Sequence, residues 1–159
     1  MACDVLVVLQ NAWFEDGRRR DRQEWLAGLW ASHTGRRLEK MLPQGVHVEV
    51  INASTEVGAE ASSSFPADLV HIRRRIETYE PRVVLGCGKI ACDALAEMGV
   101  EHVRAPHPAW RALTTTRVIA VNVEISSELA RAACARWTAE KALKETQAFI
   151  DYVGDNAIV

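Results

Sequence analysis

The chain has 159 residues, of which 48% are hydrophobic and 25% are charged, and its formal net charge is -2 at pH 7. These values are those of an ordinary globular domain, so they argue against a disordered chain and against a basic coat that binds nucleic acid without specificity. We expect a single domain over residues 1–159. Its first apolar run, Val5–Leu9, is too short to span a bilayer, so we also expect a cytoplasmic protein that makes no membrane contact.

The positions of the cysteines and arginines further limit the classes of protein to which the chain can belong. The four cysteines show no C-x-x-C spacing, so we expect small buried thiols, with no metal site, disulfide framework or cofactor. Basic residues gather in the first quarter of the chain, where Arg18, Arg19 and Arg20 are consecutive. A local basic rim of this kind can meet phosphates, whereas the alternative is a solvated loop and helix face.

The first half of the chain predicts two strands and a helix. Val5–Leu9 is a continuous apolar run, typical of a strand covered on both faces. A polar, arginine-rich loop is expected from there to about Ser32. The spacing then predicts a helix over Thr34–Leu42, a second strand over Val46–Asn52 and a loop over Ala53–Ser64.

The second half continues the alternation of helices and strands. Pro66 is expected to open a helix in which Leu69, Ile72, Ile76 and Tyr79 share one face. We then expect a strand over 83–85, a helix over 90–98 and a short strand over 102–104. Residues 114–125 fit either a strand or a helix, and 127–153 predicts a long helix with Trp137 in the core.

Alternating strands and helices predict an α/β fold, a three-layer α/β/α sandwich with a short, mainly parallel four-stranded sheet. In such sheets ligands bind beyond the carboxyl ends of the strands. Gln10 and Asn11 follow the first strand, Asn52 ends the second and His107 follows the fourth. Their convergence predicts a site, although an asparagine at a strand end is also a common turn residue.

His107 lies between Pro106 and Pro108, and Trp110 and Arg111 follow. Each proline fixes its own φ angle and pushes the preceding residue out of the helical region, so the imidazole is expected on a rigid loop. A rigid loop favours a functional donor over a filler side chain. The other four histidines, His33, His47, His71 and His102, are scattered and are expected to be structural or solvated. For Trp25 we favour the packing of a small flap.

Four segments together resemble the uracil-DNA glycosylase superfamily. Leu9-Gln10-Asn11-Ala12-Trp13 is similar to the family's early loop, and Ile51-Asn52-Ala53-Ser54-Thr55 is similar to its second-strand asparagine segment. The stretch 81–95 resembles its valine-rich strand, glycine and alanine helix. His107-Pro108-Ala109-Trp110-Arg111 is similar to its late histidine loop. The resemblance covers about residues 5–113.

This resemblance implies an enzyme that extrudes a damaged or modified base from DNA and hydrolyses its N-glycosidic bond. It implies that Asn11 positions the water and that His107 donates to the base oxygen. Gln10 and Asn52 would contact the base, Trp13 would wall its pocket and Trp30 would stack on it. The family's iron–sulfur cysteines are absent, so no cluster is implied.

The same resemblance implies DNA as the partner, duplex or single-stranded. Since the chain is compact and shows no accessory domain, a protein partner that supplies targeting is a further possibility. Trp110 or Arg111 would enter the gap left in the duplex. Phosphates would be met by the basic and glycine residues Arg18, Arg19, Arg20, Gly88 and Lys89.

Two alternatives stay open at this point. The family's glycine and proline of the early loop are replaced by Leu9 and Ala12, which also suits a catalytically silent module that binds nucleic acid or a protein. Gly86-x-Gly88 between a strand and a helix matches a relaxed dinucleotide fingerprint, but the acidic residue expected about twenty positions later is missing.

Overall fold

A four-stranded parallel sheet forms the centre of the computed structural model, which describes residues 2–156. Its strands are β1 (Val5–Leu9), β2 (Val48–Asn52), β3 (Val83–Cys87) and β4 (Val103–Ala105). They lie in the order β2-β1-β3-β4, and every neighbouring pair is parallel. The predicted fold class is therefore confirmed.

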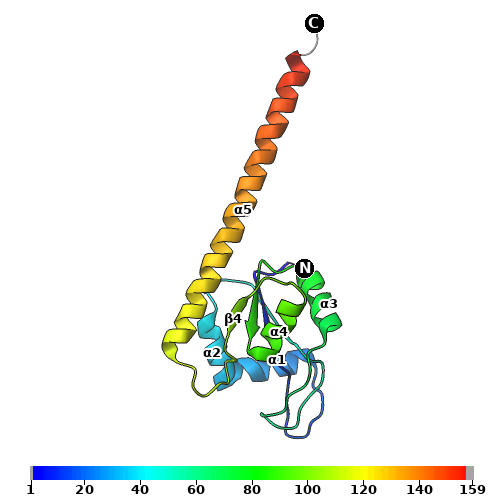
Figure 1. The fold of residues 1–159 in the computed structure, drawn as a ribbon, viewed down its shortest axis with the longest axis vertical. Coiled ribbons are helices and arrows are strands. Elements are labelled where there is room, and N and C mark those ends of the chain that lie inside the picture. Colours follow the sequence, from blue (N-terminus) through cyan, green and yellow to red (C-terminus); the bar gives the residue numbers. More distant parts are fainter. Residues whose placement is uncertain (1, 157–159) are drawn as a thin grey trace.

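Helices cover both faces of this sheet (Figure 1). On one face lie α2 (His33–Met41) and the first part of α5 (Thr115–Asn156), with α1 (Arg22–Ala31) at their edge. On the other face lie α3 (Leu69–Tyr79) and α4 (Lys89–Glu97). The connection after β1 thus goes to one face and the connection after β3 to the other.

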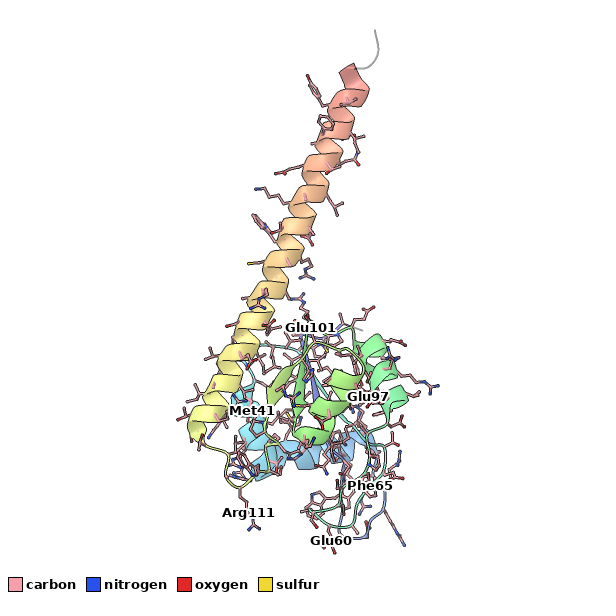
Figure 2. All side chains as sticks on the ribbon, viewed as in Figure 1. Met41, Glu60, Phe65, Glu97, Glu101 and Arg111 are labelled. Atoms are coloured by element: carbon pink, nitrogen blue, oxygen red, sulfur yellow. The ribbon has the colours of Figure 1, made fainter. Side chains whose placement is uncertain are left out.

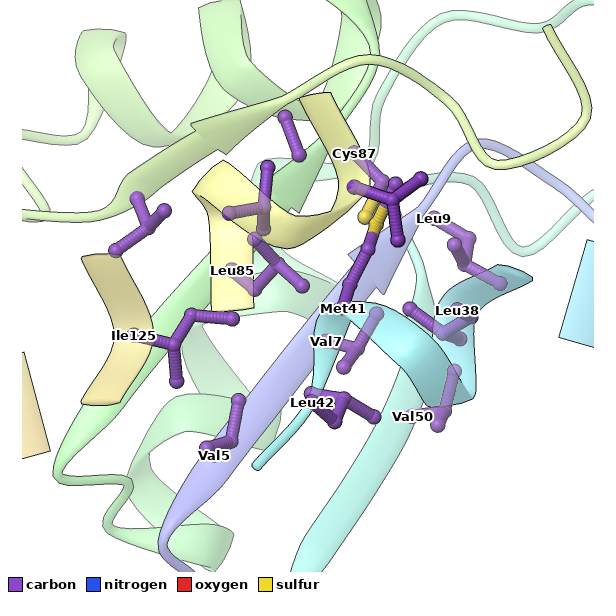
Figure 3. Close-up of a cluster of buried hydrophobic side chains, with 14 of the residues drawn as sticks. Val5, Val7, Leu9, Leu38, Met41, Leu42, Val50, Leu85, Cys87 and Ile125 are labelled. Atoms are coloured by element: carbon purple, nitrogen blue, oxygen red, sulfur yellow. The ribbon is translucent and has the colours of Figure 1, made fainter. Parts of the chain in front are cut away.

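Alternate residues of β1 face the two cores, as the pleat of a strand requires. Val5, Val7 and Leu9 pack with α2 and α5, whereas Leu6 and Val8 pack with α3 and α4. Figure 3 shows the first of these clusters, with Met41 and Ile125 over the strands. All five residues of β1 are buried, which explains the continuous apolar run in the sequence.

The prediction of a loop up to Ser32 was wrong, because α1 occupies Arg22–Ala31. Its N-cap is Asp21, whose carboxylate accepts the backbone N–H of Glu24 at 2.9 Å. An acidic residue followed three positions later by glutamate is a helix-start signal that the arginine-rich composition obscured. None of the residues of α1 is buried, so the apolar periodicity that reveals a helix is weak there.

Other boundaries moved by a few residues, and one ambiguity is resolved. The second strand begins at Val48, and the helix expected from Pro66 begins at Leu69 after the N-cap Asp68. Residues 115–125 are helical and continue into α5 without a break.

Two burial predictions failed on that helix. Trp137 is 64% exposed and not part of the core, and Cys134 is exposed. The other cysteines, Cys3, Cys87 and Cys92, are buried as expected. The reason in both cases is that α5 extends beyond the sheet, so the side chains of this part of the helix have no sheet to pack against.

The loops that follow the strands gather at one end of the molecule. Figure 2 shows Glu60 and Phe65, which follow β2, at the same end as Arg111, which follows β4. Glu101, which precedes β4, lies at the opposite end. The free part of α5 projects past that opposite end, so it leaves the carboxyl ends of the strands open (Figure 1).

Candidate functional site

A cavity of about 450 Å³ lies at the carboxyl ends of the strands, a volume within the range of small-molecule pockets. Gln10, Asn11 and Trp13 line it from the segment after β1, Asn52 lines it from the end of β2, and His107 lines it from the loop after β4. The structure therefore brings these five predicted residues together. Trp25, Gly28 and Leu29 of the unpredicted helix α1 close one side.

The segment after β1 is held by a short parallel bridge to Gly58. Gly58 N–H donates to the Ala12 carbonyl, and Phe14 N–H donates to the Gly58 carbonyl, both at 2.9 Å. A Cβ atom at position 58 would lie 2.2 Å from the Cβ of Ser63, so only glycine fits. This bridge fixes the segment after β1 beside the loop that follows β2.

Asn11 and Asn52 present their amides differently. Asn11 Nδ2 donates to the Ala12 carbonyl at 3.0 Å, which leaves Asn11 Oδ1 as an acceptor. Asn52 lies opposite Leu9 in the sheet, and its Oδ1 is buried without a hydrogen-bond partner among the described residues. An unpaired buried acceptor costs free energy, so this amide is suited to a ligand that brings a donor.

His107 is arranged as a neutral hydrogen-bond donor. Its Nδ1 accepts the backbone N–H of Ala109 at 3.1 Å, so the proton of the neutral ring is on Nε2. Burial lowers the pKa of His107, because the charged imidazolium loses hydration there. Gly88, at φ 88°, lets the loop approach, since a Cβ atom there would lie 3.3 Å from the Cβ of His107.

Arg37 of α2 anchors this histidine loop, a role that the sequence did not reveal. Its Nη1 donates to the carbonyls of Pro108 at 3.0 Å and Trp110 at 2.8 Å, and its Nη2 donates to that of Leu113 at 2.8 Å. Three charge-assisted bonds to one loop limit its movement relative to α2. The only sequence signal was a charged residue among the apolar positions of a helix.

A second cavity, of about 300 Å³, adjoins the first and shares Ala12, Phe14, Trp25 and Asn52 with it. Four arginines from three segments line it, namely Arg19, Arg20, Arg22 and Arg75. His71 lines it too, although the sequence placed this histidine among the structural or solvated ones. Helix α3 brings His71 and Arg75 beside the arginine segment of residues 18–22, which no local pattern predicts.

Two of these guanidinium groups are neutralised by acids and two are not. Arg20 pairs with Asp16 at 2.9 Å and with Glu24 at 3.5 Å, and Arg22 pairs with Glu49 at 3.2 Å. Within the described part of the chain, neither Arg19 nor Arg75 has an acidic partner, and Arg19 instead donates to the Thr55 carbonyl. Burial first, and then the charge of Arg75, lowers the pKa of His71. Glu56 also lines this cavity, so its wall carries four arginines and one carboxylate, an excess of positive charge that favours anions.

Several predicted contact residues lie outside both cavities. Trp30 is on α1 and lines neither, and Arg18 is exposed. The N–H of Gly88 donates to the Ala105 carbonyl at 2.8 Å, and Lys89 Nζ pairs with Asp93, so neither group is free to meet a phosphate as it stands.

Trp110 and Arg111 are exposed on the loop that follows His107, at the end of the molecule where the cavity opens. Their insertion into a duplex stays a prediction.

The glycine fingerprint after β3 has a packing explanation. A Cβ atom at Gly86 would lie 3.0 Å from Cys92 Sγ and 3.1 Å from a Leu95 methyl group, so this glycine allows α4 to approach β3. Because the Gly88 N–H is already bonded, the loop does not offer the phosphate cradle that a dinucleotide site needs.

Three other features of the described residues concern possible metal ligands, the thiols and the hydropathy of the helices. In the part of the chain that the structure describes, no three His, Cys, Asp or Glu side chains are grouped to hold a metal ion. Burial raises the pKa values of Cys3, Cys87 and Cys92, so these thiols are poor nucleophiles. No helix within residues 2–156 is long and apolar enough to cross a membrane.

Comparisons of the chain with protein-family models, with curated proteins and with solved structures give no match. The function therefore has to be argued from the geometry of the two cavities.

Proposed function

We propose that this protein binds a damaged or modified pyrimidine extruded from DNA and hydrolyses its N-glycosidic bond. The observation that carries the proposal is the shared cavity of Asn11, Asn52 and His107, in which Asn52 Oδ1 is a buried acceptor without a partner. The resemblance of four sequence segments to the uracil-DNA glycosylase superfamily supports the same assignment.

The hydrogen-bonding groups of the cavity match a pyrimidine of the uracil type. Such a base has an N–H donor between two carbonyl oxygens, and Asn52 offers an acceptor and a donor on one amide. In this proposal Asn52 Oδ1 accepts the base N3–H, and His107 Nε2–H donates to the O2 oxygen. Trp13, which is 46% exposed, covers the mouth of the cavity as an aromatic wall.

The proposed reaction breaks the bond between the sugar C1′ and the base nitrogen, and the bonding electron pair leaves with the base. Negative charge then develops on the base oxygen, where a neutral donor such as His107 stabilises it. Water oriented by Asn11 Oδ1 adds to C1′ and releases its proton to solvent. Among the described residues no carboxylate lines this cavity, so no side chain there lends negative charge to the sugar cation, and we expect slow turnover.

The arginine-lined cavity would serve the DNA backbone. Arg19 and Arg75 have no acidic partner among the described residues, and a phosphate there would lie next to the extruded nucleotide. The free thiols of Cys3, Cys87, Cys92 and Cys134 suit a reducing compartment, so we place the activity in the cytoplasm.

A second candidate function is a catalytically silent module that binds the same base without cleaving it. The observation that favours it is that none of the described residues around Asn11, Asn52 and His107 in this cavity is acidic, together with the internal hydrogen bond of the Asn11 amide. Both candidates require base binding, and they differ only in product formation.

The test is a single-turnover cleavage assay on DNA that contains uracil, hydroxymethyluracil or mismatched thymine. Release of base should fall on the order of a hundredfold or more in Asn11→Ala and in His107→Ala, as for loss of a positioned catalytic group. His33→Ala is the matched control, because His33 is exposed and lines neither cavity.

The outcomes separate the candidates. Binding of these substrates without any product favours the silent module. Unchanged turnover in both Asn11→Ala and His107→Ala contradicts the assignment of roles.

A further inference from the structure

Helix α5 extends far beyond the domain that it helps to build. It has 42 residues, which corresponds to about 63 Å of helix. Its first part is packed on the sheet through Val118, Val121 and Ile125, whereas every side chain from Ala133 to Asp155 is exposed. Figure 1 shows this second part standing free of the other elements.

The exposed part continues the apolar seam of the buried part. From Leu129 onward, residues alternately three and four positions apart lie on the same face as Ile125. The apolar residues of this seam are Leu129, Ala132, Ala139, Leu143, Ile150 and Val153, and its two polar positions are Arg136 and Thr146. Leu143 is 71% exposed and Ile150 is 55% exposed, so the domain does not cover these two large side chains of the seam, whereas Leu129 packs against the edge of the core. A spacing of this kind is the signature of a two-stranded coiled coil.

We propose that the seam pairs antiparallel with the same seam of a second copy of this chain. In this arrangement each layer joins one larger and one smaller side chain across the interface. The four layers, each formed twice, are Leu129 with Val153, Ala132 with Ile150, Arg136 with Thr146, and Ala139 with Leu143. Alternation of large and small residues lets the two helices interdigitate and pack closely.

The opposite orientation is excluded by charge and by space. In a parallel pair Arg136 would face Arg136 of the second copy inside the seam, and like charges there repel. The same seam also faces the domain over residues 118–125. In a parallel pair each domain would therefore lie in the space that the other one needs.

The length of the helix suits the antiparallel pair. Leu129 is half-buried at the edge of the domain, and α5 ends at Asn156, three residues after the last layer residue, Val153. The described helix of the second copy would thus reach as far as Leu129 without overlapping the part of the seam that the sheet covers. The two domains would lie at opposite ends, and both candidate sites would stay open, since they face away from the free part of α5 (Figure 1).

Sedimentation of the full chain measures the association. We expect a dimer for the wild-type chain and a monomer for Leu143→Asp, because this change places two carboxylates in the two central layers. Trp137→Asp is the matched control, because it also puts an aspartate in place of a large exposed side chain but lies on the opposite face of the helix, and it should stay dimeric. Thermal unfolding of each variant checks that the sheet domain still folds.

Disulfide cross-linking measures the orientation, in a Cys134→Ser background that removes the exposed native thiol. Under oxidation, a mixture of Ala132→Cys chains and Ile150→Cys chains should form the mixed disulfide, and Ile150→Cys alone should not cross-link. A monomeric wild-type chain, a dimer that survives Leu143→Asp, or self-cross-linking of Ile150→Cys would overturn the proposal.

Discussion

The unpaired Oδ1 of Asn52 allows stability and binding to be separated in one variant. Asn52→Leu keeps about the same side-chain shape and removes the buried acceptor that has no partner among the described residues. Relief of an unsatisfied buried polar group is worth about 1–3 kcal/mol. For a chain of this size that gain corresponds to about 3–10 °C in the melting temperature. We therefore expect Asn52→Leu to melt at the same temperature as the wild type or above it.

The same variant should lose its ligand. Thermal unfolding is measured for each protein with and without a large excess of free uracil, which at about 100 times Kd stabilises a binding protein by about 2.7 kcal/mol. The melting temperature of the wild type should rise when uracil is added, and that of Asn52→Leu should not. Raised stability together with lost binding would indicate that Asn52 serves ligand binding and does not stabilise the fold.

Asn122→Leu supplies the contrast. Asn122 Nδ2 donates to the Lys40 carbonyl at 3.1 Å, so its replacement breaks a satisfied bond and should lower stability by about 0.5–1.5 kcal/mol. If Asn52→Leu is destabilised as much as Asn122→Leu, then Asn52 is a structural residue and the argument for base recognition fails.

Three further predictions concern the surroundings of the cavities. Arg37 donates to three carbonyls of the histidine loop and is not expected to touch the substrate. Arg37→Gln should therefore loosen that loop and lower the rate of base release about tenfold or more, with little change in the affinity for DNA. An equal loss of affinity for DNA would contradict this. Arg75→Gln should reduce the slope of log affinity for DNA against log salt by about one, whereas the exposed neighbour Arg73→Gln should leave it unchanged. Burial lowers the pKa of His107, so the unfolded chain binds a proton at this residue more readily than the folded chain does. The stability that neutral His107 contributes above about pH 6.5 should therefore decline as the pH falls through the lowered pKa. In denaturant unfolding, the free energies of wild type and His107→Gln should differ less at acidic pH than at neutral pH.

Part of the candidate site could be predicted from local sequence patterns, and part of it could not. Asn11, Asn52 and His107 were predicted to converge because each lies at or just beyond the end of a strand, and parallel strands present their carboxyl ends at one edge of a sheet. The rule needs only the order of the elements, so it worked from one sequence. The role of Arg37 could not be predicted in this way, because its three acceptors are backbone carbonyls more than seventy positions away in the sequence.

The sequence by itself determined the parallel α/β sandwich, because the buried run of β1 and the 3.6-residue periodicity of α2, α3 and α4 are local consequences of burial. Only the tertiary structure decided what the helix surfaces meet. It brought Arg75 of α3 to Arg19, and it placed α1, a helix with no buried residue, along one side of the cavity that Asn11, Asn52 and His107 line. It also showed that one seam of α5 is buried at Ile125 and exposed at Ile150, since the same spacing serves a core and an interface alike.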